Sequence, residues 1–144
     1  MENIDVTVRE LTVEELPIIW PLISDANPKM TEEQFTSYVN EMVTLGYRCI
    51  AAFDGEKLAG VCGFWYGVQF WCGRYVEMDN VRMFPEYRGK GVGGKMMAAV
   101  EEIAREKGAE LAWLKSYTHN TAGHKFFHRH DFWIQGFLFR KNFS

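Results

Sequence analysis

Four glycines and three cations fall within eight residues, Arg88 to Lys95, of this 144-residue chain. The glycines remove side chains from a bend that opens a predicted helix, so the main chain there is accessible. The first N–H groups of a helix have no partner within the helix, and the aligned peptide dipoles add partial positive charge. The side chains of Arg88, Lys90 and Lys95 add full charges. This combination favours phosphate oxygens that lie directly on the main chain.

A second set of polar residues falls on the strand-like run 74–84. This run precedes the glycine-rich stretch 88–95, called the glycine loop below. Alternation with a period of two predicts that one face of this strand carries Tyr75, Glu77, Asp79, Val81 and Met83. A carboxylate on an otherwise apolar face is suited to take a proton from a nucleophile. Glu77 and Asp79 are therefore the two candidates for a general base. The interpretation that both carboxylates point into solvent, where neighbouring strands splay apart, stays open.

Hydrophobic periodicity and capping signals predict the elements that position these residues, with capping boxes at 12–15 and 31–34. Strands are expected at residues 4–11, 47–53, 58–68, 74–84, 110–117 and 132–141, and helices at 12–24, 31–46, 91–107 and 119–130. This order predicts a single α/β domain over residues 1–144, with a mixed, mostly antiparallel sheet of six to seven strands and about four flanking helices. The strands on either side of the glycine loop and its helix are expected to be parallel neighbours, with a ligand at their carboxyl ends.

The composition of the chain limits the classes of function that it is expected to have. The net charge of −3 argues against nucleic acid as a partner, and no apolar stretch reaches the length of a membrane span. The three cysteines, Cys49, Cys62 and Cys72, cannot all pair in disulfides, so a reducing compartment, the cytoplasm, is expected. His124 and His128 are four residues apart, but no cysteine or acidic ligand stands at a matching spacing, so no metal is predicted.

Two phosphate-binding patterns compete for the glycine loop. Gly89-x4-Gly94-Lys95 matches the start of a Walker A loop, but Met96 stands where a magnesium-binding Ser or Thr is required. The pattern that fits is Arg-x-x-Gly-x-Gly, which begins at Arg88 and has Pro85 three residues before it. The stretch 81–93 closely resembles the acetyl-CoA-binding motif of the GNAT superfamily of N-acetyltransferases. The resemblance covers nearly the whole chain, because the order of elements also matches.

Several ligand contacts are implied by that resemblance. The pyrophosphate of CoA would lie on the backbone amides of Arg88, Gly89, Lys90, Gly91, Val92, Gly93 and Gly94. The pantetheine arm would pair with the strand edge at Val81, Arg82 and Met83, as an extended peptide adds to a sheet. Acetyl-CoA is therefore the expected co-substrate. The resemblance also implies Glu77 as the general base, since it falls eleven residues before Arg88, where some family members place theirs, and Asp79 is the alternative.

The resemblance extends to a second motif, on the helix at 119–130, which carries Asn120 and Phe127. Asn120 would lie near the pantetheine or the acetyl group. Phe127 stands where the family usually has a tyrosine that protonates the departing thiolate, and Asp131 replaces the glycine usual before the final Phe. Tyr117 is a candidate replacement acid, and its interpretation as a half-buried strand aromatic stays open.

The predicted function is acetyl-CoA-dependent N-acetyl transfer by direct attack of a primary amine. No covalent enzyme intermediate is expected, because no cysteine sits with a partner histidine in a recognisable arrangement. The alternative is a CoA-binding regulatory module without transfer activity. The expected partner is a small-molecule or peptide amine, and the apolar segment 132–139 would suit packing against a second copy in a homodimer.

Overall fold

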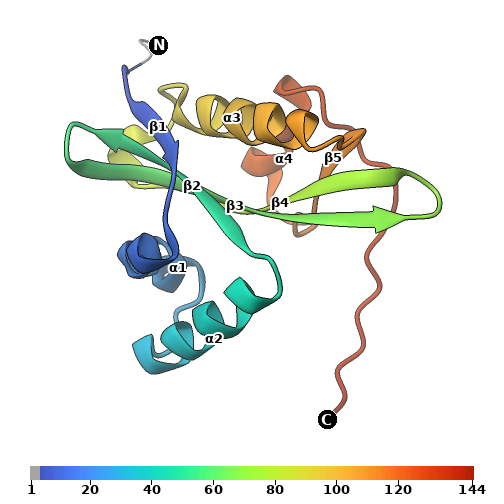
Figure 1. The fold of residues 1–144 in the computed structure, drawn as a ribbon, viewed down its shortest axis with the longest axis horizontal. Coiled ribbons are helices and arrows are strands. Elements are labelled where there is room, and N and C mark those ends of the chain that lie inside the picture. Colours follow the sequence, from blue (N-terminus) through green and yellow to red (C-terminus); the bar gives the residue numbers. More distant parts are fainter. Residues whose placement is uncertain (1–3) are drawn as a thin grey trace.

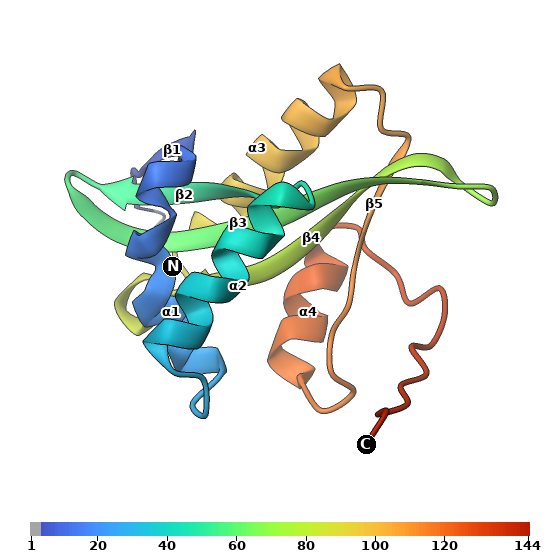
Figure 2. The same ribbon diagram turned by 60° about the horizontal axis from the view of Figure 1, so that its bottom comes forward.

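The computed structural model describes residues 4–144 as a five-stranded sheet between two layers of helices (Figures 1 and 2). In their order across the sheet, the strands are β1 (Thr7–Glu10), β2 (Arg48–Asp54), β3 (Lys57–Gln69), β4 (Gly73–Met83) and β5 (Leu111–Leu114). The first three neighbouring pairs are antiparallel, whereas β4 and β5 are parallel. The mixed, mostly antiparallel sheet and the parallel crossover are thus confirmed.

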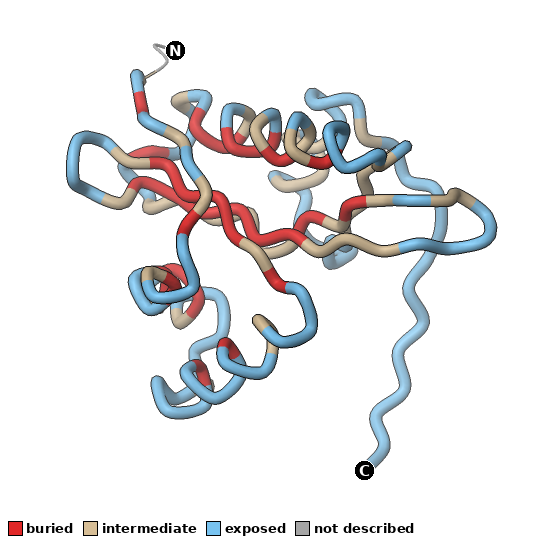
Figure 3. Tube along the Cα trace, viewed as in Figure 1, coloured by how far each residue is buried: buried red, intermediate tan, exposed pale blue. Residues whose placement is uncertain are grey.

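Each face of the sheet is covered by its own pair of helices. One face carries α3 (Val92–Glu106) and α4 (Thr121–Arg129), and the other carries α1 (Trp20–Ala26) and α2 (Glu32–Thr44) (Figure 1). Two 3-10 helices, η1 (Val13–Ile19) and η2 (Pro85–Tyr87), precede α1 and α3. Burial concentrates in the centre of the sheet and on the inward sides of the helices (Figure 3). Among residues 4–144, no helix has the length and apolar character that crossing a membrane requires.

The prediction of six to seven strands is wrong, because the sheet has five. Residues 132–144 form no strand, and β5 spans only Leu111–Leu114 instead of 110–117. An alternating apolar pattern favours extended backbone, but a strand exists only where a neighbour supplies the ladder of hydrogen bonds. β5 ends where its pairing with β4 ends, and the segment after α4 has no neighbouring strand to pair with in the described chain.

Strand β4 contains a bulge in its second half. Between the paired residues Asp79 and Arg82 lie two residues of β4, Asn80 and Val81, whereas the facing stretch of β3 has only Cys62. Asn80 has a φ of 54°, in the left-handed region that Asn adopts more readily than most other residues with a side chain. The extra residue reverses the alternation of side chains along the strand.

The reversal moves two side chains to the other face of the sheet. Val81 and Met83 pack with Val76 and Met78 in the core beneath α3. The prediction that they share the face of Glu77 is therefore wrong, and it fails because the period of two does not continue through a bulge. Before the bulge the alternation holds, so the carboxylates lie on the face opposite α3.

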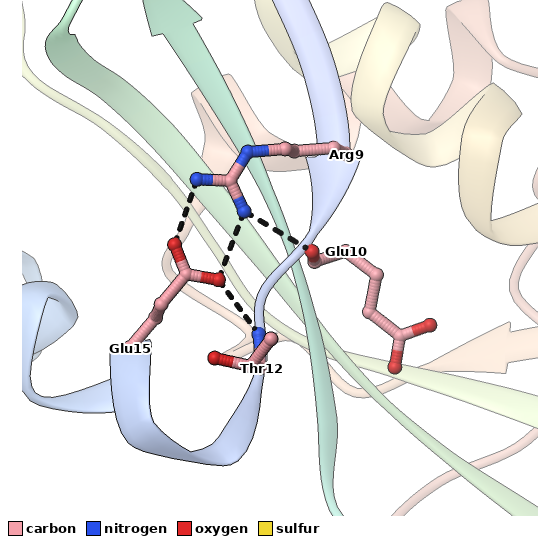
Figure 4. A network of polar contacts seen from close by, with 4 residues as sticks. All are labelled: Arg9, Glu10, Thr12 and Glu15. Carbon is pink, nitrogen blue, oxygen red and sulfur yellow. Dashed lines mark hydrogen bonds and ion pairs between the residues drawn. The ribbon is translucent and has the colours of Figure 1, made fainter.

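A polar network fixes the corner between β1 and η1, as the sequence pattern of a capping box predicts (Figure 4). The carboxylate of Glu15 accepts hydrogen bonds from Arg9 Nη1 and Nη2 at 2.9 and 2.7 Å, and from the Thr12 amide at 2.9 Å. The hydrogen bonds from Arg9 lower the pKa of Glu15 to about 2. This corner sets the path of the chain into α1, where Asp25 reaches Arg82 of β4 at 2.7 Å.

The bulge gives a stability prediction for Asn80. We expect Asn80→Ala to lower the free energy of unfolding by about 1 kcal/mol. The reason is that a backbone with positive φ costs alanine more conformational free energy than it costs asparagine. Asn80→Gly should change it by less than about 0.5 kcal/mol, since glycine adopts this φ without strain. Urea unfolding followed by tryptophan fluorescence measures both. Equal losses in the two variants would contradict a backbone origin.

Candidate active site

The loop between η2 and α3 presents a row of unpaired amides. Gly89 and Gly91 have φ values of 70° and 81°, and Gly91 is the N-cap, where it offers no side chain to the helix. The amide of Lys95 donates to the Gly91 carbonyl at 3.2 Å and so starts the helical hydrogen bonding. Over the described part of the chain, the amides of residues 89–94 have no hydrogen-bond acceptor. Such a row at a helix N-terminus fits a pyrophosphate.

Two groups predicted to serve the loop are engaged elsewhere. The Arg88 amide donates to the Pro85 carbonyl at 3.2 Å, so Arg88 would offer a ligand its exposed side chain and not its main-chain amide. The ammonium of Lys95 donates to the carbonyl of Val6 in the segment leading into β1, at 2.7 Å. The charges beside the loop are therefore those of Arg88 and Lys90, together with the partial charge of the helix end.

The last two glycines of the loop are also required for helix packing. A Cβ atom on Gly93 would lie 2.8 Å from Cζ of Phe126, and one on Gly94 would lie 2.5 Å from Cε1 of His130. Both contacts are shorter than carbon atoms tolerate, and both partners belong to α4 or its C-terminal end. Gly93 and Gly94 thus let α4 approach the start of α3, a role that the sequence pattern alone did not indicate.

Beside the loop, the second half of β4 has a free edge. β5 pairs with β4 only from Tyr75 to Met78, so residues 79–83 have β3 on one side and no strand on the other in the described structure. The predicted pantetheine-binding residues Val81, Arg82 and Met83 lie on this edge. The guanidinium of Arg82 is bound to Asp25, so this residue would offer a ligand only its main chain.

The two candidate bases lie on the same face but have different partners. Glu77 lies across from Trp65 and beside Trp113, and its Oε2 is 3.3 Å from the ammonium of Lys115. The Glu77 side chain is 19% exposed and that of Lys115 is 59% exposed. Asp79 accepts a hydrogen bond from Trp65 Nε1 at 3.3 Å. The Glu77 carboxylate is therefore partly accessible, and it forms an ion pair with an alkylammonium group.

The remaining predicted residues lie on the segment after β5. Tyr117 is in a loop, not in a strand, where it is 74% exposed and stacks on His119 with ring centroids 5.4 Å apart. The side chain of Asn120 caps α4 by accepting from the Gly123 amide at 3.1 Å. Phe127 packs against the partly buried aromatic residues at the end of α4. No hydrogen bond or ion pair in the described chain joins these three residues to Glu77.

The histidines of α4 contact backbone carbonyls. Nε2 of His124 lies 2.9 Å from the Tyr117 carbonyl, and Nδ1 of His128 lies 3.0 Å from the Phe132 carbonyl. These contacts tie both ends of α4 to the segments that flank it. Across residues 4–144, no three side chains of His, Cys, Asp or Glu gather in a way that would hold a metal ion.

Comparison with known proteins places this arrangement in a family. The model of the acetyltransferase (GNAT) family matches residues 7–132. A thialysine N-epsilon-acetyltransferase of Caenorhabditis elegans is 35% identical over 63 residues, which are 43% of this chain and 39% of the relative. The enzyme of the same name from Bos taurus is 35% identical over 84 residues, or 48% of this chain and 49% of the relative. The chain thus spans less than half the length of these curated relatives.

Solved structures share the fold at low sequence identity. An aminoglycoside N-acetyltransferase solved in complex with CoA aligns with a TM-score of 0.84 at 16% identity, over 97% of this chain and 96% of that one. A protein described as a transcriptional regulator from Bacillus halodurans aligns with a TM-score of 0.81 at 21% identity, over 96% and 100%. At these identities the likeness concerns the fold alone.

The three thiols of the chain differ in how far they are buried. Cys49 and Cys62 are fully buried in the sheet, and Cys72 is partly exposed in the turn before β4. Burial raises the pKa of Cys49 to about 12, and it raises the pKa of Cys62 as well. A thiol of such high pKa is not a thiolate nucleophile at neutral pH.

We therefore predict that native protein at pH 8 exposes one thiol to Ellman's reagent, and that denatured protein exposes all three. The reactive residue is Cys72, so Cys72→Ser should leave the native protein without reactive thiol and the denatured protein with two. Absorbance at 412 nm before and after adding guanidinium chloride measures both states. A second thiol that reacts in native protein would contradict the burial.

Proposed function

The chain belongs to the acetyltransferase (GNAT) family, and we propose that it transfers an acetyl group from acetyl-CoA to a primary amine. The observation that carries this proposal is the row of unpaired amides at residues 89–94, next to the free edge of β4 at residues 79–83. The row of amides suits a pyrophosphate, and the free strand edge suits a chain of secondary amides. CoA has both groups, joined by a short linker.

The chain's own residues would hold acetyl-CoA in an extended path. The amides of residues 89–94 would bind the pyrophosphate, with Arg88 and Lys90 adding charge, and the main chain of Val81–Met83 would pair with the pantetheine arm. When bound, acetyl-CoA supplies a thioester whose carbonyl carbon accepts an amine, so that a C–N bond forms and the C–S bond breaks. The protein's tasks are then to position the amine and to accept its proton.

Removing that proton is the demanding step for this chain. A lysine-type amine has a pKa of about 10.4, so only about one molecule in 2,500 is neutral at pH 7. A carboxylate base at the point of attack overcomes this scarcity. We assign the role to Glu77, because Asp79 is held by the indole of Trp65. Direct attack by the amine is favoured, since burial removes Cys49 and Cys62 as covalent carriers.

The proposed acceptor is a lysine-like amine with a flexible apolar arm. The curated relatives are named for thialysine, whose reacting group is an amine at the end of such an arm. Support on this chain comes from Glu77, where the ammonium of Lys115 occupies the place that an acceptor amine would take. The flanking rings of Trp65 and Trp113 suit the arm.

The proposed location is the cytoplasm, because three free cysteines favour a reducing compartment.

Calorimetric titration with acetyl-CoA and desulfo-CoA tests the cofactor site. We expect micromolar binding to the unmodified protein and at least a tenfold weakening in Gly91→Glu, because a carboxylate at the helix start repels the pyrophosphate. Gly55→Glu is the matched control: Gly55 also has a positive φ, 62°, and lies in the β2–β3 turn with open space around it. Binding should survive there. Absence of binding to folded, unmodified protein would overturn the proposal.

Turnover of Glu77→Gln tests the base. We expect kcat with thialysine or lysine to fall about 100-fold or more, with the KM for acetyl-CoA changed less than about twofold, because the amide cannot accept the proton. Asp79→Asn is the control and should retain most activity. Release of CoA thiol is measured in the Cys72→Ser background. Unchanged turnover would remove Glu77 from the role, and CoA binding without turnover of any amine would favour a regulatory module.

A further inference from the structure

The side chain of Lys115 holds its ammonium group against the proposed base. Nζ of Lys115 lies 3.3 Å from Oε2 of Glu77, and more than half of the Lys115 side chain is exposed. Within residues 4–144, this is the one ion pair that involves either residue. The chain thus puts a lysine amine of its own where the proposed reaction needs the amine of the acceptor.

The end of β5 brings Lys115 to the start of the free edge of β4. The last pair of the parallel ladder is Met78 and Leu114, and Lys115 directly follows Leu114. The proposed pyrophosphate site at residues 89–94 lies beyond the C-terminal end of β4. A pantetheine arm that runs from there along residues 83 to 79 would carry its thioester toward Lys115.

We propose that the protein acetylates its own Lys115 when acetyl-CoA is bound and external amines are scarce. This inference rests on the proposed function, and it adds a modification site and a means of regulation to the same site. An amine tethered beside the base has a high effective concentration, because it has no translational freedom left to lose. Lys115 would therefore react ahead of a dilute free amine.

The transfer balances without any further reactant. The Lys115 ammonium passes one proton to Glu77, and Glu77 passes it on to water. The Nζ nitrogen then attacks the acetyl carbonyl carbon, so that the N–C bond forms while the C–S bond breaks and its electron pair stays on sulfur. A second proton leaves the nitrogen and ends on the sulfur as the thiol of CoA.

Acetylation would change the acceptor site after a single reaction. An amide nitrogen is not a nucleophile, so each chain would acquire one acetyl group at this position. The acetyl group removes the positive charge of the lysine, and the ion pair with Glu77 is lost with it. The carboxylate would then be free to pair with the ammonium group of an external acceptor.

Peptide mass spectrometry after incubation with isotopically labelled acetyl-CoA tests the modification. We expect one label per chain, at Lys115, with a rate per chain that stays constant when the protein concentration is varied tenfold. Lys57 is the matched control within the same chain, because its ammonium lies 3.0 Å from Oε1 of Glu86 and 62% of its side chain is exposed. It should stay unlabelled, whereas spontaneous transfer would label both lysines.

Two variants connect the label to the proposed base. Lys115→Arg should abolish it, and Glu77→Gln should slow labelling of Lys115 about 100-fold, because the amide cannot take the proton. Acetyl groups acquired during expression carry no isotope. They count as the same modification only where Glu77→Gln protein lacks them.

A second readout needs no acetyl transfer from CoA. Succinimidyl acetate labels exposed lysines directly, and Glu77→Gln protein should keep Lys115 free for this reagent. Saturating desulfo-CoA should slow the labelling of Lys115 and leave that of Lys57 unchanged, since the bound arm would cover only Lys115. Equal labelling of Lys115 with and without bound desulfo-CoA would overturn the inference.

Calorimetric binding and amine turnover distinguish the two ways of failing. Protein that binds acetyl-CoA and acetylates thialysine, yet leaves Lys115 unmodified, would overturn self-acetylation and leave the proposed function standing. Protein that does not bind acetyl-CoA would overturn both. Equal labelling of Lys115 and Lys57 would mean spontaneous chemistry, and a rate per chain that rises with protein concentration would mean transfer between chains. Either result contradicts the inference.

Discussion

The bulge in β4 is the constraint on which the arrangement of the site depends. β4 must stay paired with β3 along its length, yet it pairs with β5 only up to Met78. One extra residue, with Asn80 in a left-handed conformation, bends the strand and turns its side chains over. The same local change frees the edge at residues 79–83 and buries Val81 and Met83 under α3, while Glu77 stays on the opposite face. A regular strand would put the proposed base, Glu77, and the side chains of Val81 and Met83 on one face.

The glycine loop meets two requirements, and both favour residues without side chains. In the proposed function, its first part needs bare main chain for the pyrophosphate, with Gly91 at a positive φ where α3 begins. Its second part needs bare main chain for contact with α4, at Gly93 and Gly94. Because the partners of these glycines, Phe126 and His130, belong to α4 or its C-terminal end, their packing connects the proposed cofactor site to α4. Substitutions in the two parts should therefore differ in effect: the first concerns ligand charge and turn geometry, the second helix packing.

Features governed by neighbouring residues could be predicted from the sequence. The capping box of α2 is present, with both hydrogen bonds between Thr31 and Gln34, and the parallel β4–β5 crossover follows from the helix between them. Features that depend on distant partners could not. The face of Val81 depends on one backbone angle, and Lys95 bonds to a carbonyl 89 residues away in the chain. The expected strand at 132–141 had the correct composition but no partner within the described chain. Asn80 was the available signal for the bulge, because asparagine adopts a positive φ more readily than most residues with a side chain.

The phenylalanine at position 127 weighs little against transfer activity. A general acid matters most when the leaving group is a poor one, and a thiol with a pKa of about 8.5 leaves as a thiolate near neutral pH without much help. Phe127 contributes instead to packing, because its ring meets Phe132 across the motif that ends α4. A tyrosine hydroxyl there would have to find a polar partner within an apolar contact. The difficult proton in this reaction is the one on the amine, and the chain places a partly accessible carboxylate, Glu77, where an alkylammonium group already binds. In the proposed reaction, the demand for acid–base chemistry would therefore fall on the face of the sheet opposite α3, not on α4.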